Sequence, residues 1–212
     1  MEQILQQFRF EGKPVSCEPF GNGHINRTFH VVCDNHREYT VQRINRVAFH
    51  HPEELIENID AVTRFISAKP GLQQETIHLL PAKDGRKYYV DPDGEYWRAY
   101  SYISEGLCLD MPRSPEDFYQ AAVAFGQFQQ ALSDFPAETL HETIPHFHDT
   151  IDRLRQLRES VEADRAHRAA EVAPELSFLF AREEELGTLC RMQARGELPL
   201  RVTHNEIGRA HV

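Results

Sequence analysis

A glycine-rich hexapeptide, Gly21-Asn22-Gly23-His24-Ile25-Asn26, lies between two segments rich in β-branched and aromatic residues. Glycine can adopt a positive φ and lets the backbone come close to a ligand, and successive backbone N–H groups of such a loop can bind phosphate oxygens. The same pattern is typical of an ordinary glycine-rich hairpin turn, and it lacks the third glycine of a dinucleotide-binding fingerprint. The hexapeptide is therefore a candidate phosphate-binding loop, with a plain turn as the alternative.

A second candidate is the tripeptide His204-Asn205-Glu206, which follows the apolar and basic segment 198–203. A carboxylate placed directly after a His-Asn turn can accept a proton from a substrate hydroxyl group. By itself the tripeptide is more typical of a polar surface loop. Its interpretation as a catalytic group depends on the elements that surround it.

The segment His146-x-His148-Asp149 has residue types that often bind metal ions at short spacing. A different interpretation is favoured, because Asp149 and Thr150 stand directly before a helical pattern and such residues commonly cap helix N-termini. We therefore expect a helix cap here and no metal site.

The predicted secondary structure that must position these residues changes near residue 104, from mostly strands to helices. Upstream, β-branched and aromatic runs bounded by turn residues predict antiparallel strands, and apolar residues at helical spacing predict one helix, 52–68. The predicted strands are 15–20, 28–33, 38–45, 87–91 and 96–103. Downstream, three helical patterns follow, at about 115–135, 147–170 and 174–194. Two lobes are expected to meet near residues 104–109, and a cleft between lobes is a usual place for a ligand.

Composition and charge narrow the classes of partner. The 212 residues carry 33 Asp and Glu against 23 Lys and Arg, a net charge of −10, without a basic stripe. Nucleic acids and anionic membranes require clustered positive charge, so a small molecule is the expected partner. The four cysteines form no C-x-x-C pair, as is usual for reduced thiols, and neither a signal peptide nor a membrane-spanning run is visible. We expect a cytoplasmic protein.

Three segments in this order, 21–26, 142–150 and 199–205, resemble the aminoglycoside phosphotransferase and choline kinase family, and within it the N-acetylhexosamine 1-kinases. The resemblance runs over nearly the whole chain. It implies an α+β, protein-kinase-like bilobal fold. Residues 1–104 would form the β-rich, nucleotide-binding N-terminal lobe, and residues 105–206 the first part of a helical C-terminal lobe.

The resemblance also implies roles for individual residues. In phosphoryl transfer from ATP, a glycine-rich loop covers the phosphates, Mg2+ ions bridge them and a catalytic Asp orients the acceptor hydroxyl. The implied cofactors are ATP and Mg2+. The implied nucleotide-binding residues are Gly21, Asn22, Gly23, His24, Tyr100, Tyr102 and Ile103, with His24 near the phosphates or the acceptor. The implied catalytic residues are His204, Asn205 and Glu206.

Two positions depart from the family pattern. Kinases generally place a Lys on the third strand to bind phosphate, whereas this strand offers Arg43, which can bind phosphate with a different reach and geometry. Arg43 is the implied phosphate ligand, with a surface strand residue as the alternative. Its helix partner is expected to be Glu54 or Asn58, which flank the apolar stripe of the helix.

The second departure is at the C-terminus, where the family has Asp and this chain has Glu206. Residues 207–212 match the translation of a sequencing adapter, so we expect a non-native tail, with a divergent C-terminus as the alternative. We accordingly expect a truncated and inactive chain, whose magnesium ligands lie beyond its end.

The predicted function is ATP-dependent phosphorylation of a sugar hydroxyl, the anomeric hydroxyl of an N-acetylhexosamine. The alternatives are a kinase of another small acceptor, such as an aminoglycoside, choline, ethanolamine or homoserine, and a non-catalytic nucleotide-binding module.

Overall fold

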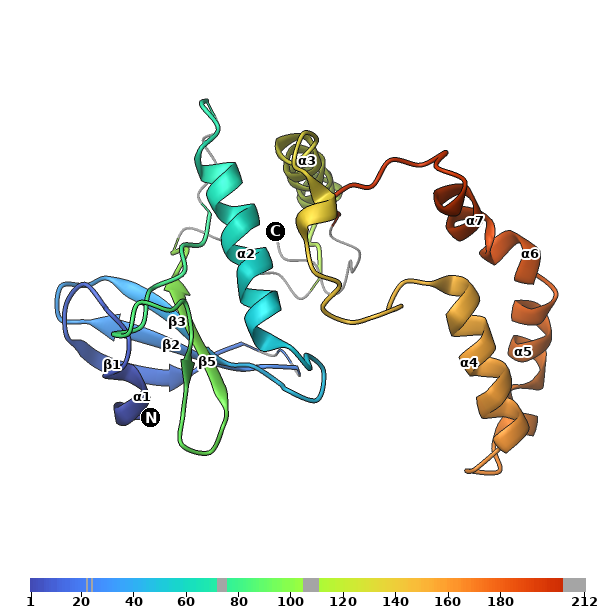
Figure 1. The fold of residues 1–212 in the computed structure, drawn as a ribbon, viewed down its shortest axis with the longest axis horizontal. Helices are drawn as coiled ribbons and strands as arrows, with labels where there is room; N and C mark the ends of the chain where they lie inside the picture. The colour runs from blue at the N-terminus through green and yellow to red at the C-terminus, as the bar shows by residue number, and fades with distance from the viewer. Residues whose placement is uncertain (22, 24, 72–75, 105–110, 204–212) are drawn as a thin grey trace. The chain divides into compact units, whose positions relative to one another are not determined.

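The computed structural model describes residues 1–21, 23, 25–71, 76–104 and 111–203 (Figure 1). Asn22, His24 and the predicted catalytic residues His204, Asn205 and Glu206 lie outside the described residues. The chain divides into two compact units, Met1–Thr143 with Val202–Val212, and Ile144–Arg201. The predicted lobe boundary near residue 104 lies within the first of these units.

The first unit contains a five-stranded antiparallel sheet with strand order β1-β2-β3-β5-β4 (Figure 1). A short helix, α1 (Glu2–Leu5), precedes it. The strands are β1 (Pro14–Pro19), β2 (Arg27–Cys33), β3 (Glu38–Arg43), β4 (Tyr89–Val90) and β5 (Tyr96–Ser101). The predicted antiparallel hairpins are confirmed. The predicted strand 87–91 is shorter, because Asp91 already belongs to the turn that joins β4 to β5, where its Oδ1 accepts hydrogen bonds from the N–H groups of Asp93 and Glu95.

One face of the sheet, here called the core face, is closed by apolar packing. Val31, Val41 and Ala99 lie on three adjacent strands and are fully buried at 0% exposure. Ile4 and Phe8 from the N-terminal segment pack over them. Such tight packing leaves this face no room for a ligand.

The opposite face, here called the α2 face, packs against helix α2 (Pro52–Ser67). The predicted helix 52–68 is confirmed, and Pro52 occupies its first turn, where the missing N–H of proline is tolerated. Ile56 of α2 packs with Ile44 beside Tyr96 and Tyr100 of β5. The helix therefore covers the β5 end of this face (Figure 1). The β1–β2 end carries half-exposed polar residues instead.

Helix α3 (Pro115–Ala131) is followed by the short 3₁₀ turn η1 (Ala137–Thr139). Ser114 is the N-cap of α3, and its Oγ accepts a hydrogen bond from the Asp117 N–H at 3.2 Å. The apolar side of α3 is buried at its C-terminal end, where Leu132 packs with Ile66 of α2 and Phe135. Phe118, in the first turn, is 66% exposed, because the described contacts of α2 reach only the later turns of α3.

The second unit is helical and contains α4 (Thr150–Ala163), η2 (Ala169–Val172), α5 (Ala173–Phe180), α6 (Glu183–Leu186) and α7 (Thr188–Ala194). The prediction of two long helices here was wrong. The first ends at Ala163, because Asp164 adopts a left-handed φ of 33° and its Oδ1 accepts from the N–H of Arg168. The second is interrupted at Arg182 and at Gly187, which serves as both the C-cap of α6 and the N-cap of α7. Within the described ranges, no helix combines the length and the hydropathy needed to cross a membrane.

Candidate functional site

The glycine-rich loop joins β1 to β2 at one end of the sheet. The Phe20 N–H donates to the Thr28 carbonyl at 2.9 Å, and Asn26 Oδ1 accepts from the Asn45 N–H at 3.0 Å, so both ends of the loop are fixed. Gly21 has a φ of +79°, which favours glycine. A Cβ atom added at Gly21 or Gly23 would meet nothing within 4 Å. The described part of the loop therefore leaves open space beside its backbone.

An aromatic cluster of Phe20, His30 and Tyr102 lies directly before this loop. The ring centroids are 5.6 Å apart for Phe20 and Tyr102, 5.6 Å for Phe20 and His30, and 4.5 Å for His30 and Tyr102. The Glu38 carboxylate, 2.6 Å from His30 Nε2, and the Glu38 carbonyl, which accepts from the Tyr102 N–H, hold two of the rings in place. The structure thus brings Tyr102, one of the sequence-predicted residues, beside the residue that precedes Gly21.

The neighbouring predicted residue Tyr100 lies on the α2 face of β5. Burial raises the pKa of its hydroxyl, while the nearby charge of Arg98 and a hydrogen bond with Thr40 act in the opposite direction. Because alternate residues of a strand share a face, Tyr100 and Arg98 lie on the same side as Thr40 and Gln42 of β3. Ile103 is partly buried just beyond the end of the strand.

Sequence reasoning missed a row of polar side chains across the α2 face. Thr28, Gln42 and Arg98 are directly opposite one another on β2, β3 and β5. Gln42 Nε2 donates to Thr28 Oγ1 at 2.9 Å, and Gln42 Oε1 accepts from Arg98 Nε at 3.0 Å and from Nη2 at 2.7 Å. Arg98 Nη1 is shielded from solvent and has no hydrogen-bond partner among the described residues, and burial lowers the pKa of this guanidinium group. The period-two pattern shows which residues of one strand share a face, whereas the register between strands is a tertiary feature.

Arg43 is placed on the other side of the sheet. It follows Val41 by two residues, so it lies on the core face, where its Nη1 is 4.0 Å from Glu95 Oε1. The expected helix partner was Glu54 or Asn58, and Asn58 bonds instead to the backbone of His141. The prediction of a partner on α2 failed because strand alternation turns Arg43 away from that helix.

Asp91 lies close enough to Arg43 for the guanidinium charge to affect its ionisation. Burial opposes ionisation of the Asp91 carboxyl, but hydrogen bonds from Trp97 Nε1 and from the N–H groups of Glu95 and Asp93, together with the Arg43 charge, lower its pKa overall. Arg43 thus lies beside the turn between β4 and β5, whose conformation these hydrogen bonds fix.

Asp149 caps α4, which confirms the predicted helix cap. Its Oδ1 accepts from the N–H groups of Ile151 and Asp152, each at 3.1 Å, and the Asp152 hydrogen bond is the main reason that the pKa of this carboxyl is lowered. Thr150 does not cap the helix, because it is the first helical residue and its Oγ1 donates to the Leu186 carbonyl. Among the residues that the structure describes, no group of three or more His, Cys, Asp or Glu side chains is arranged to hold a metal ion.

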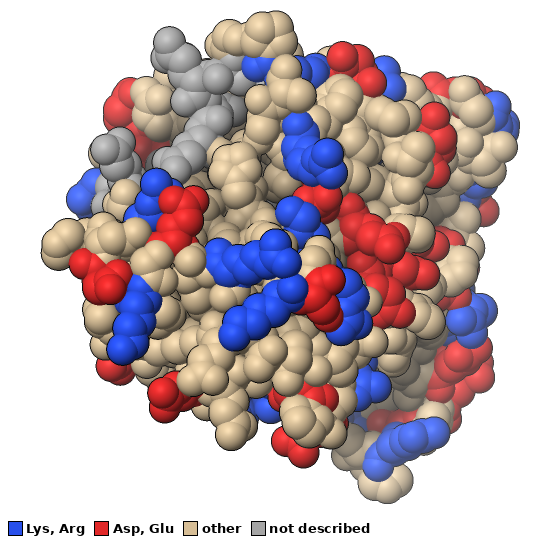
Figure 2. All heavy atoms as spheres, turned by 60° about the vertical axis from the view of Figure 1, so that its left-hand side comes forward, with Lys and Arg blue, Asp and Glu red and all other residues tan. Residues whose placement is uncertain are grey.

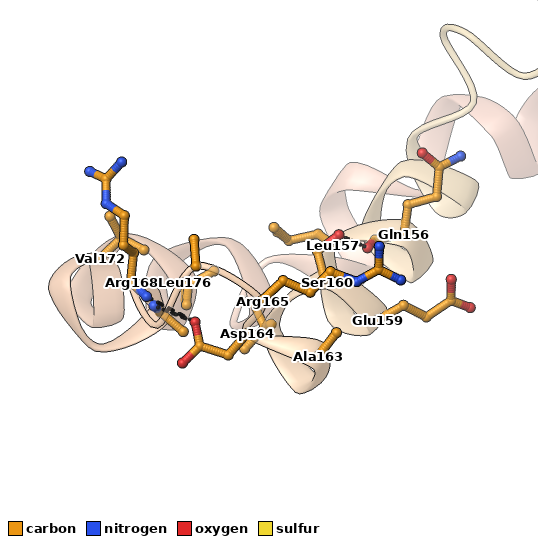
Figure 3. Close-up of a pocket in the computed structure, with 13 residues that line it drawn as sticks. Gln156, Leu157, Glu159, Ser160, Ala163, Asp164, Arg165, Arg168, Val172 and Leu176 are labelled. Atoms are coloured by element: carbon orange, nitrogen blue, oxygen red, sulfur yellow. Dashed lines mark hydrogen bonds between the residues drawn. The ribbon is translucent and has the colours of Figure 1, made fainter.

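A cavity of about 820 Å³ lies within the second unit, between the C-terminal half of α4 and α5 (Figure 3). Leu157, Val161 and Leu176 contribute apolar walls, and Asp164 and Arg165 lie at the turn that closes one side. None of the described residues that were predicted to bind nucleotide lines it. We therefore assign the candidate site to the sheet of the first unit.

The surface charges are mixed in sign. Figure 2 shows Lys and Arg side chains interspersed with Asp and Glu side chains over the face drawn. Several form ion pairs on the protein surface, such as Arg37 with Glu11 at 3.0 Å. Surface pairs of this kind contribute little to stability.

Residues 16–212 match the APH family, described as the phosphotransferase enzyme family. Among solved structures, the chain is similar to the aminoglycoside phosphotransferase from Alicyclobacillus acidocaldarius, with 14% identity, a TM-score of 0.48, and coverage of 92% of this chain and 51% of that one. It is also similar to the amicoumacin kinase hAmiN, in complex with AMP-PNP, Ca2+ and Ami, with 14% identity, a TM-score of 0.46, and coverage of 74% of this chain and 52% of that one. The chain spans about half the length of these two proteins. Since the family match covers nearly the whole sequence, the chain belongs to the phosphotransferase enzyme family.

Proposed function

We propose that this chain contributes the nucleotide-binding part of an ATP-dependent small-molecule kinase. The observation that supports this most directly is the contact between Tyr102 and Phe20, whose ring centroids are 5.6 Å apart. Tyr102 belongs to the segment that is expected to contact adenine, and Phe20 directly precedes the glycine-rich loop. A base and its phosphates would then have adjacent binding places on one sheet.

The described residues fit a nucleotide in shape. The positions of Gly21 and Gly23 are open, so phosphate oxygens can approach the backbone there without meeting a side chain of the described residues. Exposed aromatic surface suits a nucleobase, and Phe20 is 45% exposed. ATP with Mg2+ would supply the γ-phosphoryl group and its charge neutralisation, while the residues of this chain hold and orient the nucleotide.

The proposed acceptor chemistry rests on the sequence resemblance. We infer that the carboxylate at position 206, after His204 and Asn205, accepts the proton of the acceptor hydroxyl. The proposed acceptor is the anomeric hydroxyl of an N-acetylhexosamine, and an aminoglycoside, choline, ethanolamine or homoserine is the alternative. The proposed site of action is the cytoplasm.

Nucleotide binding by residues 1–212 is the first test. Isothermal titration with AMP-PNP and Mg2+ is expected to give saturable binding at one site. Gly23→Val should weaken this binding with little effect on folding, because the added side chain enters the space beside the loop and not the protein interior. A folded chain that binds no adenine nucleotide would contradict the proposed function.

Phosphoryl transfer is the second test. Continuing the chain with the C-terminal half of a family member, and introducing Glu206→Asp, should give transfer of radiolabelled phosphate from ATP to N-acetylglucosamine or N-acetylgalactosamine. Glu206→Asn in the same protein should reduce kcat by orders of magnitude with little change in ATP affinity, because an amide cannot accept the proton. Transfer only to an acceptor other than a sugar would overturn the hexosamine assignment and leave the kinase assignment standing.

A further inference from the structure

A ligand that contacts the glycine-rich loop must lie on the α2 face of the sheet. The core face is excluded because Val31, Val41 and Ala99 are fully buried across its three central strands. At the β1–β2 end, the α2 face is formed by half-buried polar side chains, among them Thr28 and His30. Any cation that serves bound phosphates from this sheet must therefore project from the α2 face.

Arg98 is a cation on that face, and no acid in the described part of the chain forms an ion pair with it. Its guanidinium bonds to the neutral amide of Gln42 and lies 5.8 Å from the centre of the Tyr100 ring. No carboxylate of the described residues lies within 4 Å of it. Burying an uncompensated charge is unfavourable, and a nearby anion relieves that cost.

The unsatisfied nitrogen of Arg98 is a second, independent observation. Nη1 is one of two side-chain atoms, the other being Glu53 Oε2, that are buried without a hydrogen-bond partner in the described parts of the chain. Buried polar groups are nearly always hydrogen-bonded, so an exception in a site requires an explanation. A phosphate group near Gln42 would place negative charge beside this guanidinium.

Gln42 connects the buried charge to the loop. Two Arg98 donors fix the amide oxygen, which orients the amide nitrogen toward Thr28, two residues beyond Asn26 at the end of the loop. The amide nitrogen carries two hydrogens and gives one to Thr28 Oγ1. Arg98 thus orients a donor group at the base of the hairpin that carries the glycines.

We propose that Arg98, acting through Gln42, supplies the positive charge that holds the nucleotide phosphates, in place of a lysine on β3 and in place of Arg43. Gln42 is the residue that donates to phosphate, and Arg98 is a positioning residue that orients it and attracts the anion. This inference rests on the proposed nucleotide-binding function.

The test compares ligands with and without phosphates on the intact chain. Arg98→Met should lower the affinity for AMP-PNP with Mg2+ by about tenfold or more, which is the size expected when the hydrogen bond from Gln42 to a charged phosphate loses its orientation. The affinity for adenosine should change by less than about twofold, since adenosine carries no charge to attract. Arg43→Met is the matched control and should change neither affinity.

Two variants of Gln42 separate binding from folding. Gln42→Glu keeps the shape and allows an ion pair with Arg98, so the chain should remain folded while AMP-PNP affinity falls by at least as much as in Arg98→Met. Combining Gln42→Lys with Arg98→Met restores one cation at the same place and should recover most of the lost affinity. Circular dichroism and the fluorescence of Trp97 report folding in each variant.

The outcomes are distinct. Equal losses for adenosine and AMP-PNP in Arg98→Met would mean that Arg98 only supports the fold, and would overturn the inference. The inference would also be overturned if Arg43→Met, and not Arg98→Met, lowered the affinity for AMP-PNP without lowering the affinity for adenosine. Absence of nucleotide binding by the folded wild-type chain would overturn the proposed function itself, whereas wild-type binding with unaffected Arg98 and Gln42 variants would overturn this inference alone.

Discussion

The side chain of Asn58 pairs with the backbone of His141 through two hydrogen bonds. Asn58 Nδ2 donates to the His141 carbonyl at 2.8 Å, and Asn58 Oδ1 accepts from the His141 N–H at 2.9 Å. The pairing resembles that of two backbone amides and joins α2 to the segment after η1, 83 residues away in the sequence. It fixes to α2 a segment of the first unit that lies outside the helices and strands.

Replacing Asn58 should therefore destabilise the first unit. Asn58→Ala is expected to lower the free energy of unfolding by about 1–2 kcal/mol, because two backbone groups lose their partner. Urea unfolding followed by Trp97, the single tryptophan, measures this change. As a control, Arg64→Ala removes a side chain of α2 that is 77% exposed and should change the free energy by less than about 0.5 kcal/mol. Equal effects of the two substitutions would contradict the structural role of Asn58.

The two described glycines of the loop should respond differently to alanine. Gly21→Ala is expected to cost about 1 kcal/mol of stability, because Gly21 has a φ of +79° that an alanine adopts only with strain. Gly23→Ala should be nearly neutral for stability, since Gly23 is not in that left-handed region and its Cβ would meet no neighbour. Thermal unfolding of both variants measures the difference. A larger loss for Gly23→Ala would show that the loop has another conformation.

The carboxyl of Asp91 should contribute to stability in a pH-dependent way. Although burial opposes its ionisation, the hydrogen bonds from Trp97 and the turn backbone lower its folded pKa below the ordinary value of about 3.9. A lowered acid pKa gives stability that is complete above the unfolded value and is lost as the pH falls through the folded value. The difference in unfolding free energy between the wild type and Asp91→Asn should be constant near neutral pH and shrink below about pH 4.

The pH dependence of Trp97 emission is a second readout, because Trp97 Nε1 donates to Asp91 Oδ2, and Asp134 provides its control. Its pKa is also lowered, by a hydrogen bond from Lys69, but it lies far in sequence from Trp97, in the turn that follows α3. Asp134→Asn should leave the pH dependence of the Trp97 emission in the folded state unchanged, whereas Asp91→Asn should abolish it. A Trp97 emission that keeps its wild-type pH dependence in Asp91→Asn would refute the assignment.

Asp149 should stabilise the start of α4 as an N-cap. Asp149→Ala is expected to destabilise the second unit by about 1 kcal/mol, whereas Asp149→Asn, which keeps an acceptor oxygen, should retain most of the stability. Thermal unfolding followed by circular dichroism at the helix band distinguishes the two. Equal losses in both variants would indicate that the carboxylate charge, and not the hydrogen bonds to Ile151 and Asp152, stabilises this end.

Local signals were sufficient to predict much of the fold. Alternating apolar residues and turn dipeptides predicted the antiparallel hairpins, and Pro52 and the helical apolar spacing predicted α2 within one residue of its observed end at Ser67. Asp149 likewise identified the start of α4. These features depend on hydrogen bonds and conformations of residues close together in the chain, so the sequence contains the information directly.

The helices of the second unit were predicted less well. Charge and apolar spacing continue through Asp164 and Gly187, so the periodicity gave no sign that the helices end there. Asp164 adopts a left-handed conformation in which its Oδ1 bonds to the N–H groups of Arg168 and Ala169. At Asp164 these side-chain hydrogen bonds compete with continuation of the helix. The periodicity of apolar residues does not show which of the two conformations is adopted.

At the candidate site, the sequence located the glycine-rich loop and Tyr102, whereas the tertiary structure decided which residues lie around them. The residue types on β3 suggested Arg43 as the phosphate ligand, but the sheet register turns Arg43 toward Glu95 and brings Arg98, 56 residues beyond Gln42, into contact with the Gln42 amide. The register between β3 and β5 results from burying Val41 and Ala99 together on the core face. Because a shift of one residue would exchange the two faces, this long-range packing determines which cation lies beside Gln42, and no local pattern in the sequence contains it.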